Sequence, residues 1–518
     1  MELLAGIDVG TSGTKTVLID PDGRTVASSF VEYPLSQPHP GWAEQDPEEW
    51  WSACCESLRQ VLERSGASPG DVLGVGLSGQ MHGAVLLDRD GEVLRPAIIW
   101  CDTRSSEQCE AIEKIIGRDE VIRLTSNPAL PNFTATKVLW VKDHEPENYA
   151  KISKVLLPKD YIRYRLTGKF MTEVSDASGT LFLDVGRRRW SEEMLLGLGV
   201  PLSWLPEVHE SPVVSARVSA PAAAATGLLA GTPVAGGAGD QAAGAVGNGI
   251  VKPGIVSSTI GTSGVVFAFT EDIKTDELGR LHSFCHAVPG KWHVMGVTQA
   301  AGGSLQWFRN NFGQLEVETG KLCKVDPYEL LTQEAARVDP GCEGLVYLPY
   351  LMGERTPHLD PRAKGVFFGI TARHGKPHFV RAVMEGVTFS LKDCLGLIER
   401  LGIPVSEVRA SGGGARSRLW QGMQADVFDK RVVTVSATEG PALGVALLAG
   451  VGVGVYESVE AACDRVIGLG DALEPDSGRA AVYAGWHRIY GELYEQLRVL
   501  FRQADSLATG IESPAASR

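Results

Sequence analysis

The sequence predicts an α/β protein with two domains, and three observations lead to this prediction. Strand-like and helix-like segments alternate along the chain. Its 518 residues are more than one compact core usually holds. The tetrapeptide Gly-Thr-Ser-Gly stands at Gly10–Gly13 and recurs half a chain later at Gly261–Gly264. We therefore expect a first domain over residues 1–249, a related second domain over 250–500, and a disordered tail over 501–518, where residues are small and polar.

The elements of the first domain begin at the N-terminus. The apolar run Leu3–Asp8 predicts a strand, the glycine motif a turn, and the alternation of Thr14–Asp20 a second strand. A turn at Pro21–Gly23 leads into a third strand at Arg24–Phe30. Periodicity and turn residues then predict strands at 72–78 and 232–235, a hairpin around 88–91, a surface excursion at 211–231, and helices near 47–64, 105–116, 134–142, 158–164 and 191–196.

The second domain opens with a copy of the first hairpin. The strand-like segment Gly254–Ile260 leads into the second glycine motif, and Val265–Phe269 leads out of it. The remaining predicted elements are a strand at 408–411 and helices near 300–312, 379–401, 417–428 and 442–449.

Composition excludes several function classes. The formal charge is −14 with no basic run, so the chain has no electrostatic footprint for nucleic acid or an anionic membrane. The most apolar stretch, Gly440–Tyr456, is shorter than a bilayer span, and the N-terminus has no secretory signal pattern. The nine cysteines include no CxxC pair, so we expect no disulfide framework or zinc site, and a reducing cytoplasm.

The glycine motifs suit a phosphate group. Glycine turns let the backbone approach closely and direct several N–H groups to one point. The chain has 60 glycines, whereas ordinary usage predicts about 36. The strand before the first motif ends in Asp8, and the matching residue of the second copy is Thr259. A carboxylate beside a phosphate loop indicates a cation between them, so we favour a Mg²⁺ role for Asp8 over turn capping.

A second carboxylate follows a glycine-rich segment. Asp240 stands in Gly236–Gly247, where a strand ends and a small-residue helix begins. Helix capping is its ordinary role. The glycines, however, leave room for a substrate hydroxyl, and a positioned aspartate can act as general base toward an attacking alcohol.

Two further segments are candidates for ligand contacts. Gly412–Gly414 joins a strand to a helix and allows a nucleotide to lie against bare backbone. Ser78–Gly83 (SGQMHG) follows a strand and offers polar and soft apolar groups to a small polyol. Trp100 supplies a candidate wall and Asp102 a candidate hydroxyl contact.

With these motifs in order, the chain resembles the FGGY family of carbohydrate kinases from about Leu4 to Leu497. The stretches that carry the resemblance are GIDVGTSGTK (6–15), SGQMHG (78–83), LLPKDYIRYRLTG (156–168), GAGDQAAGAVG (237–247), GERTPH (353–358), GVFFGITARHGKPHFVRAVME (365–385) and GGGARS (412–417). The resemblance implies two actin-like, ribonuclease-H-like domains with a ligand cleft between them, ATP and Mg²⁺ as cofactors, and a possible homodimer. Some relatives have Asn at the positions of Cys101 and Gln241, which leaves a sugar contact at either position open.

The resemblance also implies roles for individual residues. Asp240 is expected to be the catalytic base, and Asp8 the Mg²⁺-linked catalytic carboxylate. The expected sugar site comprises Gln80, Met81, His82, Trp100, Asp102, Asp240 and Gln241. The expected nucleotide site comprises Thr11, Ser12, Gly13, Thr14, Lys15, Gly261, Thr262, Ser263, Gly412, Gly413, Gly414 and Ser417. The favoured reaction is phosphorylation of D-xylulose. Ribulose, another ketose, a polyol or glycerol remains open as the substrate. A non-catalytic sugar sensor or an actin-like assembly protein of the same fold remains open as the class of protein.

Overall fold

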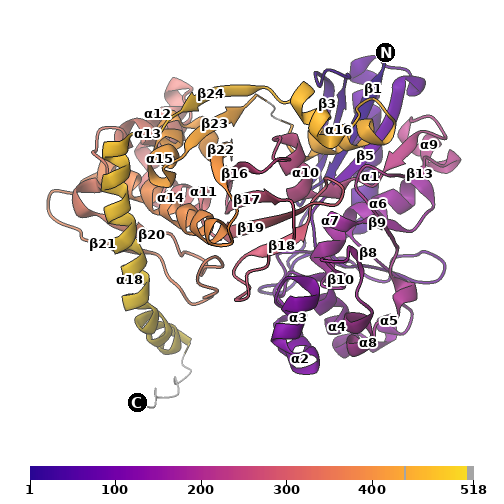
Figure 1. Cartoon of the computed structure of the whole chain (residues 1–518), viewed down its shortest axis with the longest axis horizontal. Helices are drawn as coiled ribbons and strands as arrows, with labels where there is room; N and C mark the ends of the chain where they lie inside the picture. Colours follow the sequence, from indigo (N-terminus) through magenta and orange to yellow (C-terminus); the bar gives the residue numbers. More distant parts are fainter. Residues whose placement is uncertain (437–438, 510–518) are drawn as a thin grey trace. The chain divides into compact units, whose positions relative to one another are not determined.

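The computed structural model describes residues 1–436 and 439–509 (Figure 1). Its contacts divide the chain into two compact units. Unit 1 comprises Met1–Lys252, Phe269–Val294 and Ser436–Gly468. Unit 2 comprises Pro253–Ala268, Met295–Val435 and the chain from Leu469 onward. The chain therefore leaves unit 1 after Lys252 and returns to it twice, at Phe269 and at Ser436.

The main sheet of unit 1 has the strand order β13-β14-β5-β1-β2-β3, and β15 also pairs with β5. The central strand β1 is antiparallel to β2 and parallel to β5. The strands are β1 (Leu3–Val9), β2 (Gly13–Ile19), β3 (Thr25–Glu32), β5 (Val72–Gly79), β13 (Val214–Arg217), β14 (Pro233–Ala235) and β15 (Ala238–Gly239). The predicted N-terminal hairpin and third strand are confirmed.

The second large sheet repeats this centre. Its order is β18-β19-β17-β16-β22-β23-β24, in which β16 is antiparallel to β17 and parallel to β22. The three strands β17-β16-β22 thus correspond to β2-β1-β5, as the repeated motif predicts. The strands are β16 (Gly254–Ile260), β17 (Gly264–Thr270), β18 (His282–Cys285), β19 (Trp292–Thr298), β22 (Val405–Gly412), β23 (Arg431–Val435) and β24 (Leu469–Leu473).

Helices flank both sheets. Those of unit 1 are α1 (Pro47–Ser65), α2 (Ser106–Ile116), α3 (Arg118–Thr125), α4 (Thr134–His144), α5 (Pro146–Tyr149), α6 (Pro158–Thr167), α7 (Val174–Ala177), α8 (Glu192–Leu198), α9 (Ala220–Thr226), α10 (Asp240–Gly247), α16 (Pro441–Gly452) and α17 (Val459–Val466). Those of unit 2 are α11 (Gly302–Phe312), α12 (Gln314–Cys323), α13 (Pro327–Ala335), α14 (Lys376–Arg400), α15 (Arg418–Phe428) and α18 (Ser477–Thr509). No helix among the described residues combines the length and apolar character of a membrane span.

Short two- and three-residue strands form small additional sheets: β4 (Glu44–Gln45) with β7 (Ala97–Ile98), β6 (Val85–Leu87) with β8 (Lys154–Leu156), β9 (Met171–Glu173) with β12 (Glu207–His209), β10 (Leu183–Asp184) with β11 (Arg189–Trp190), and β20 (Val346–Leu348) with β21 (Val366–Phe368).

Two predictions about irregular segments need correction. Residues 211–231, expected as a surface excursion, contain β13 and the Ser219-capped helix α9, and β13 extends the sheet. Residues 501–509, expected in the disordered tail, continue α18, whose buried residues Tyr490, Tyr494 and Phe501 anchor it. The rest of the expected tail, 510–518, lies outside the described residues.

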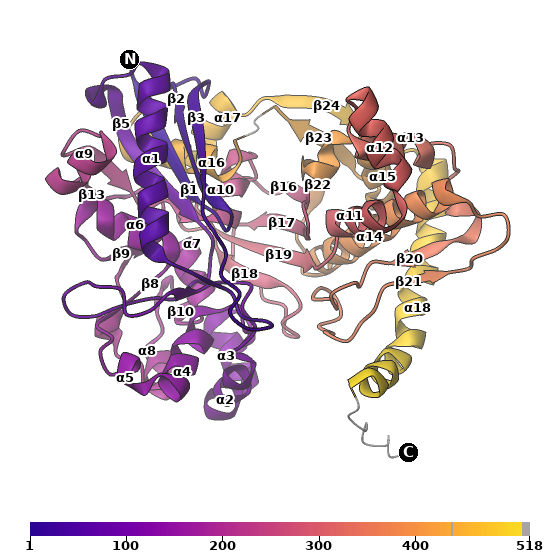
Figure 2. The same ribbon diagram turned by 180° about the vertical axis from the view of Figure 1, so that it is seen from behind.

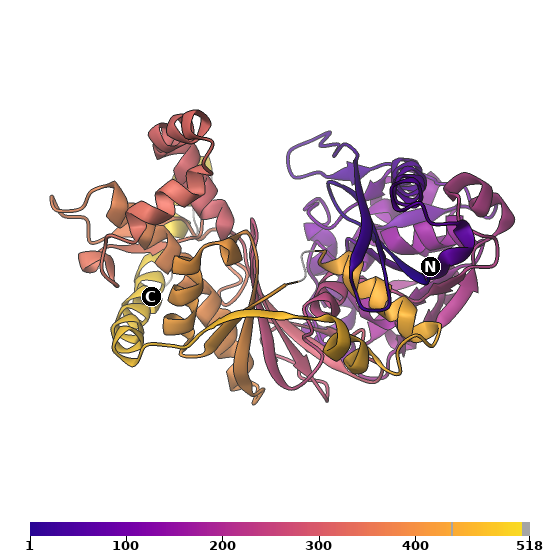
Figure 3. The ribbon, with the colours of Figure 1, turned by 90° about the horizontal axis from the view of Figure 1, so that it is seen from above.

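Helices α1 and α16 cover opposite faces of the unit 1 sheet (Figures 2 and 3). Strand residues alternate between the two faces. Ile7 and Val9 join one core cluster with Trp50 and other residues of α1. Gly6 faces α16, because a Cβ atom built on it would lie 1.9 Å from the Ala442 carbonyl oxygen. The segment Ser436–Gly468, which returns to unit 1, thus supplies the helix that covers this face of the sheet.

Glycines allow α16 to lie directly on this sheet. A Cβ atom on Gly76 of β5 would lie 1.9 Å from the carbonyl oxygen of Val445, which is backbone and cannot rotate away. We expect Gly76→Ala to lower the free energy of unfolding by about 1–3 kcal/mol or more, measured by chemical or thermal denaturation. Gly422→Ala in α15 is the matched control, since no atom lies within 4 Å of its added Cβ and alanine favours a helix. Equal stability of the two variants would contradict this packing.

Candidate active site

The ends of three neighbouring strands bring the predicted carboxylates together. Asp8 near the end of β1 pairs in register with Ser78 of β5, and Ser78 pairs with Ala238 of β15. Gly239 then acts as the N-cap residue, and α10 begins at Asp240. Asp240 is therefore not the helix cap. The carboxyl ends of parallel strands are a usual place for a ligand site in α/β sheets.

Asp8 is an unsatisfied carboxylate. Its Oδ1 atom is buried and has no hydrogen-bond partner in the described part of the chain. Burial raises the pKa of Asp8 to about 6, although Ser78 and Lys15 offset part of the rise. The matching residue of unit 2, Thr259, instead bonds Ser411 at 2.7 Å between hydroxyl oxygens. The residue at this position of unit 2 thus has a partner within the protein, whereas in unit 1 the Oδ1 atom of Asp8 remains available as an acceptor.

Asp240 has a similar electrostatic environment. Burial and the negative charge of Asp8 raise the pKa of Asp240 to about 7, while hydrogen bonds from the backbone and side chain of Gln241 act in the opposite direction. A carboxylate with a pKa near neutrality is suited to accept a proton. The side chain of Gln241 is engaged with Asp240 in this arrangement.

The Met81–His82 segment lies against the residue that precedes Asp240. A Cβ atom on Gly239 would lie 3.0 Å from Cγ of Met81. Nδ1 of His82 lies 2.7 Å from the carbonyl oxygen of Gly179, which only accepts, so Nδ1 donates. The ring of His82 packs edge-on against Phe133, with centroids 5.1 Å apart. The structure thus places Met81 beside Gly239, the residue before Asp240, and holds the ring of His82 between Gly179 and Phe133.

Gln80 and Trp100 contact the first glycine hairpin. Gln80 donates to the carbonyl oxygen of Gly10 at 3.4 Å and accepts from Thr11 Oγ1 at 3.3 Å. Trp100 donates from Nε1 to Thr11 Oγ1 at 2.9 Å, and its side chain is exposed. These two residues, expected at the sugar, therefore hold the hairpin in the structure.

Asp102 is engaged in a buried ion pair. Its carboxylate accepts from the backbone N–H of Ala43 at 2.6 Å and from Arg104 NH2 at 2.7 Å. The guanidinium of Arg104 also stacks on Trp42, 3.6 Å from the ring centroid. Because Ala43 and Arg104 already donate to the Asp102 oxygens, these oxygens have little capacity left to accept from a sugar hydroxyl. The opposite charges two residues apart are the sequence signal for this pair.

The predicted nucleotide residues of the first hairpin differ in accessibility. Thr11 is half-buried and Ser12 is exposed at the tip, whereas Gly13 and Thr14 are buried in β2. Lys15 forms an ion pair with Glu439, with 2.7 Å between Nζ and Oε2. The structure therefore presents Thr11 and Ser12 to a ligand, and it directs Thr14 into the sheet.

Unit 2 contains a cavity of about 710 Å³ at its own glycine hairpin. Five predicted nucleotide residues line it, namely Gly261, Thr262, Gly413, Gly414 and Ser417. Ser263 and Gly412 are not among its lining residues. The Ser417 hydroxyl also accepts from Trp420 N at 3.2 Å as the N-cap of α15.

Sequence reasoning missed most of the other walls of this cavity. Its floor and sides include Gln306 of α11, Asp326 before α13, Tyr328 of α13, and Arg416 after the glycines. α13 was not predicted, and a helix face carries no motif for a ligand. Arg416 had a signal, because it stands two residues after Gly414 in the same GGGARS motif.

The carboxylate of Asp8 fits Mg²⁺ only when substrate phosphates supply further ligands to the metal. No group of three His, Cys, Asp or Glu residues able to hold a metal occurs in residues 1–436 and 439–509. Mg²⁺ is commonly bound by one or two carboxylates together with substrate phosphates and water. The orphaned Oδ1 of Asp8 meets that requirement.

Comparison with known proteins adds independent information. The "Xylulose kinase" of Bacillus subtilis (strain 168) is 40% identical over 500 residues, 96% of this chain and 98% of the relative. The "Xylulose kinase" of Escherichia coli (strain K12) is 40% identical over 493 residues, 95% and 98% of the two chains. A solved structure described as a "xyloylose kinase" from Brucella ovis matches with a TM-score of 0.88 at 36% identity, covering 96% of this chain and 100% of that one.

Two family models match nearly the whole described chain. The N-terminal domain model of the FGGY family of carbohydrate kinases matches residues 3–247, and the C-terminal domain model matches residues 256–453. The expected α/β, two-domain fold is confirmed by these matches and by the Brucella ovis structure. The chain belongs to the FGGY family of carbohydrate kinases.

Proposed function

We propose that this chain transfers the γ-phosphoryl group of Mg-ATP to the terminal hydroxyl of D-xylulose, giving D-xylulose 5-phosphate. The observation that carries the phosphotransferase assignment is the pair Asp8 and Asp240, two carboxylates with raised pKa values at the ends of β1 and β15, the strands that pair with the end of β5. The choice of D-xylulose is supported by the relatives of 40% identity that align over nearly the full chain.

In this proposal Asp240 is the general base. It accepts the proton of the sugar hydroxyl as the hydroxyl oxygen attacks the γ-phosphorus in line. Met81, which lies against Gly239, and its neighbour His82 bind the sugar beside it. Asp8 would hold the Mg²⁺ ion of Mg-ATP, which when bound would supply positive charge to the phosphates. The backbone of the Gly261–Gly264 hairpin, Gly413, Gly414 and the rest of the unit 2 cavity bind the nucleotide.

A cytoplasmic location belongs to the same proposal. All nine cysteines are free, which supports a reducing compartment. ATP and a ketopentose formed during sugar breakdown are both small, diffusible cytoplasmic metabolites.

The experiment that tests the proposed substrate is ADP release with Mg-ATP and a panel of acceptors. We expect the kcat/KM for D-xylulose to exceed those for D-ribulose, L-ribulose and glycerol by about 10-fold or more, since a site that bonds sugar hydroxyls discriminates against misplaced ones. A higher value for another acceptor would reassign the substrate. No acceptor-dependent ADP release with any sugar would favour the non-catalytic sensor.

The raised pKa of Asp240 predicts a pH dependence of catalysis. A general base acts only when ionised, so kcat/KM for the sugar should fall about tenfold per pH unit below about pH 7. It should level off above that pH. Initial rates at saturating Mg-ATP between about pH 5.5 and about pH 8.5 measure the profile. A flat profile over that range would contradict an Asp240 base with this pKa.

A further inference from the structure

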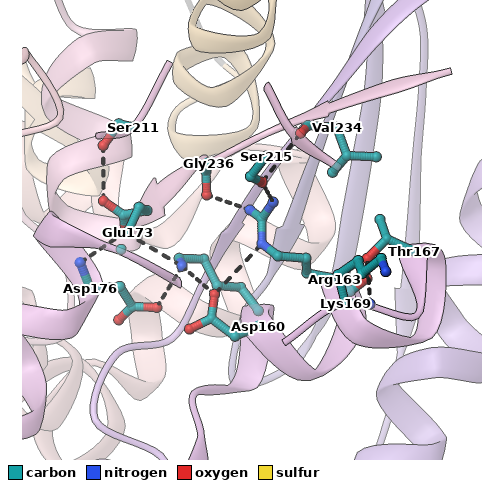
Figure 4. A network of polar contacts seen from close by, with 12 residues as sticks. Asp160, Arg163, Thr167, Lys169, Glu173, Asp176, Ser211, Ser215, Val234 and Gly236 are labelled. Carbon is teal, nitrogen blue, oxygen red and sulfur yellow. Dashed lines mark hydrogen bonds and ion pairs between the residues drawn. The ribbon is translucent and has the colours of Figure 1, made fainter. Parts of the chain in front are cut away.

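Five charged side chains lie together in unit 1 without solvent exposure (Figure 4). Lys159, Asp160 and Arg163 come from α6, Glu173 ends β9, and Asp176 lies in α7. A buried ion cluster is weak evidence for stability, because removing charges from water costs as much as their attraction returns. The LLPKDYIRYRLTG stretch, which contributes three of the five residues, has no role in the proposed chemistry. The cluster therefore requires another explanation.

Lys159 is the centre of the cluster. Its Nζ lies 2.7 Å from Asp160 Oδ1, 3.3 Å from Asp176 Oδ2 and 3.4 Å from Glu173 Oε1. Burial raises the pKa of Asp176 well above its ordinary value, which favours its neutral form. Lys159 thus joins α6 to Glu173 and to Asp176 of α7.

The carboxylate of Glu173 accepts hydrogen bonds from four donors. It accepts from the Ser175 hydroxyl at 3.0 Å and from the Ser211 hydroxyl at 2.9 Å. It also accepts from the backbone N–H groups of Ser175 at 2.7 Å and Asp176 at 2.9 Å. Carboxylate hydrogen bonds of this kind are roughly twice as strong as neutral ones.

The same two serines hold the segment before Asp240. The Ser175 hydroxyl accepts from Gly239 N at 3.1 Å, and the Ser211 carbonyl oxygen accepts from Gly237 N at 2.9 Å. Arg163 donates to the Gly236 carbonyl oxygen. Two peptide groups within four residues, Gly236–Gly237 and Ala238–Gly239, are thus held by Arg163, Ser175 and Ser211.

The glycines make this attachment necessary. Gly237 has φ +73°, and a Cβ atom there would lie 1.9 Å from the Leu77 carbonyl oxygen, so no side chain can anchor the segment. Its path depends on hydrogen bonds to its backbone, from β5 through the pairing with β15 and from Arg163, Ser175 and Ser211. Asp240 follows directly as the first residue of α10.

We propose that Glu173 is a positioning residue for Asp240, acting through Ser175 on the Gly239 N–H and through Ser211 on Gly237. The inference rests on the proposed role of Asp240 as general base. A displacement of about 1 Å at a reacting group lowers a rate about 10²-fold, so loosening this segment lowers kcat while leaving the sugar and nucleotide sites formed.

The test compares Ser175→Ala and Glu173→Gln with the control Asp184→Asn. Asp184 is also a buried carboxylate of unit 1, but it accepts from Arg187 N at 2.8 Å in a turn with no bond to the glycine segment. We expect kcat to fall about 10- to 100-fold in the first two variants. KM for D-xylulose and for ATP should stay within about threefold, and Asp184→Asn should retain kcat.

Each variant is also built in the Asp240→Asn background. A residue that acts through Asp240 has little further effect once the base is absent, so we expect losses below about twofold there. If Glu173→Gln does not fold, Ser175→Ala decides, because it removes one hydroxyl and no charge. Unchanged kcat in folded Ser175→Ala, or an equal loss in both backgrounds, would overturn the inference. Undiminished turnover of Asp240→Asn alone would instead overturn the proposed function.

Discussion

Asp240→Asn should lower kcat about 10²- to 10⁴-fold while the enzyme still binds sugar. Asparagine has nearly the same shape but cannot accept the proton of the attacking hydroxyl. The loss should therefore appear in kcat, and the dissociation constant for D-xylulose measured by calorimetry should stay within a few-fold of the original. Near-normal turnover would remove Asp240 from the role of base.

The same substitution should stabilise the fold. The pKa of Asp240 rises from 3.8 to about 7 on folding, so the ionised form disfavours the folded state. This penalty is absent below about pH 4, grows as pH rises, and reaches up to about 4 kcal/mol above pH 7. We expect Asp240→Asn to melt at a higher temperature than the original at pH 8, with the difference shrinking toward pH 4. A lower melting temperature at pH 8 would contradict the burial of this charge.

Asp8→Asn should lower kcat/KM for ATP about 10²- to 10³-fold and raise the Mg²⁺ concentration needed for half-maximal activity. The buried Oδ1 of Asp8 has no protein partner in the described residues, so its charge is available to the metal–phosphate complex. Titrating Mg²⁺ at fixed ATP measures the change. Asp184→Asn, which removes a buried carboxylate of unit 1 that bonds Arg187 N, is the matched control.

Asp8→Asn also has a second expected signature. The charge of Asp8 is one cause of the raised pKa of Asp240, so its removal should move the acid limb of the pH profile to lower pH. A simple loss of protein stability would not move it. An unaltered Mg²⁺ requirement together with an unaltered acid limb would show that Asp8 serves neither purpose.

The parts of the fold that the sequence predicted have short-range causes. The hairpin from Leu3 to Asp20 depends on alternation and a glycine turn, and the structure has β1 and β2 at that place. The start of α10 at Asp240 follows from glycines that end a strand. Local chemistry therefore located both carboxylates.

Other parts depend on contacts between distant segments. No pattern indicates that Ala442 of α16 packs on Gly6, or that Ser211 bonds Glu173. Such contacts depend on how distant segments of the chain pack on one another, which composition and periodicity do not encode. α18 was different, because buried Tyr483, Tyr490, Tyr494 and Phe501 follow helical spacing and could have predicted it.

Within the site, the motifs predicted where a residue lies better than they predicted what its side chain bonds. Gln80 and Asp102 lie in the expected segments, but their hydrogen-bond capacity is directed to Thr11 and Arg104. A residue type shows what a side chain can bond, and only the structure shows which partner it has. The reverse holds for Asp8, where the absence of a partner in the described chain distinguishes it from Thr259.

The central claim is that the chain phosphorylates D-xylulose at its terminal hydroxyl. Phosphorus-31 NMR of a reaction with Mg-ATP and D-xylulose, with the phosphorus signal correlated to the sugar protons and carbons, tests it directly. The phosphorus signal reports the new phosphate ester, and the correlation identifies the carbon that carries it. The account predicts ADP and D-xylulose 5-phosphate in equal amounts. Inorganic phosphate without a sugar ester, or a phosphate on another hydroxyl, would contradict it.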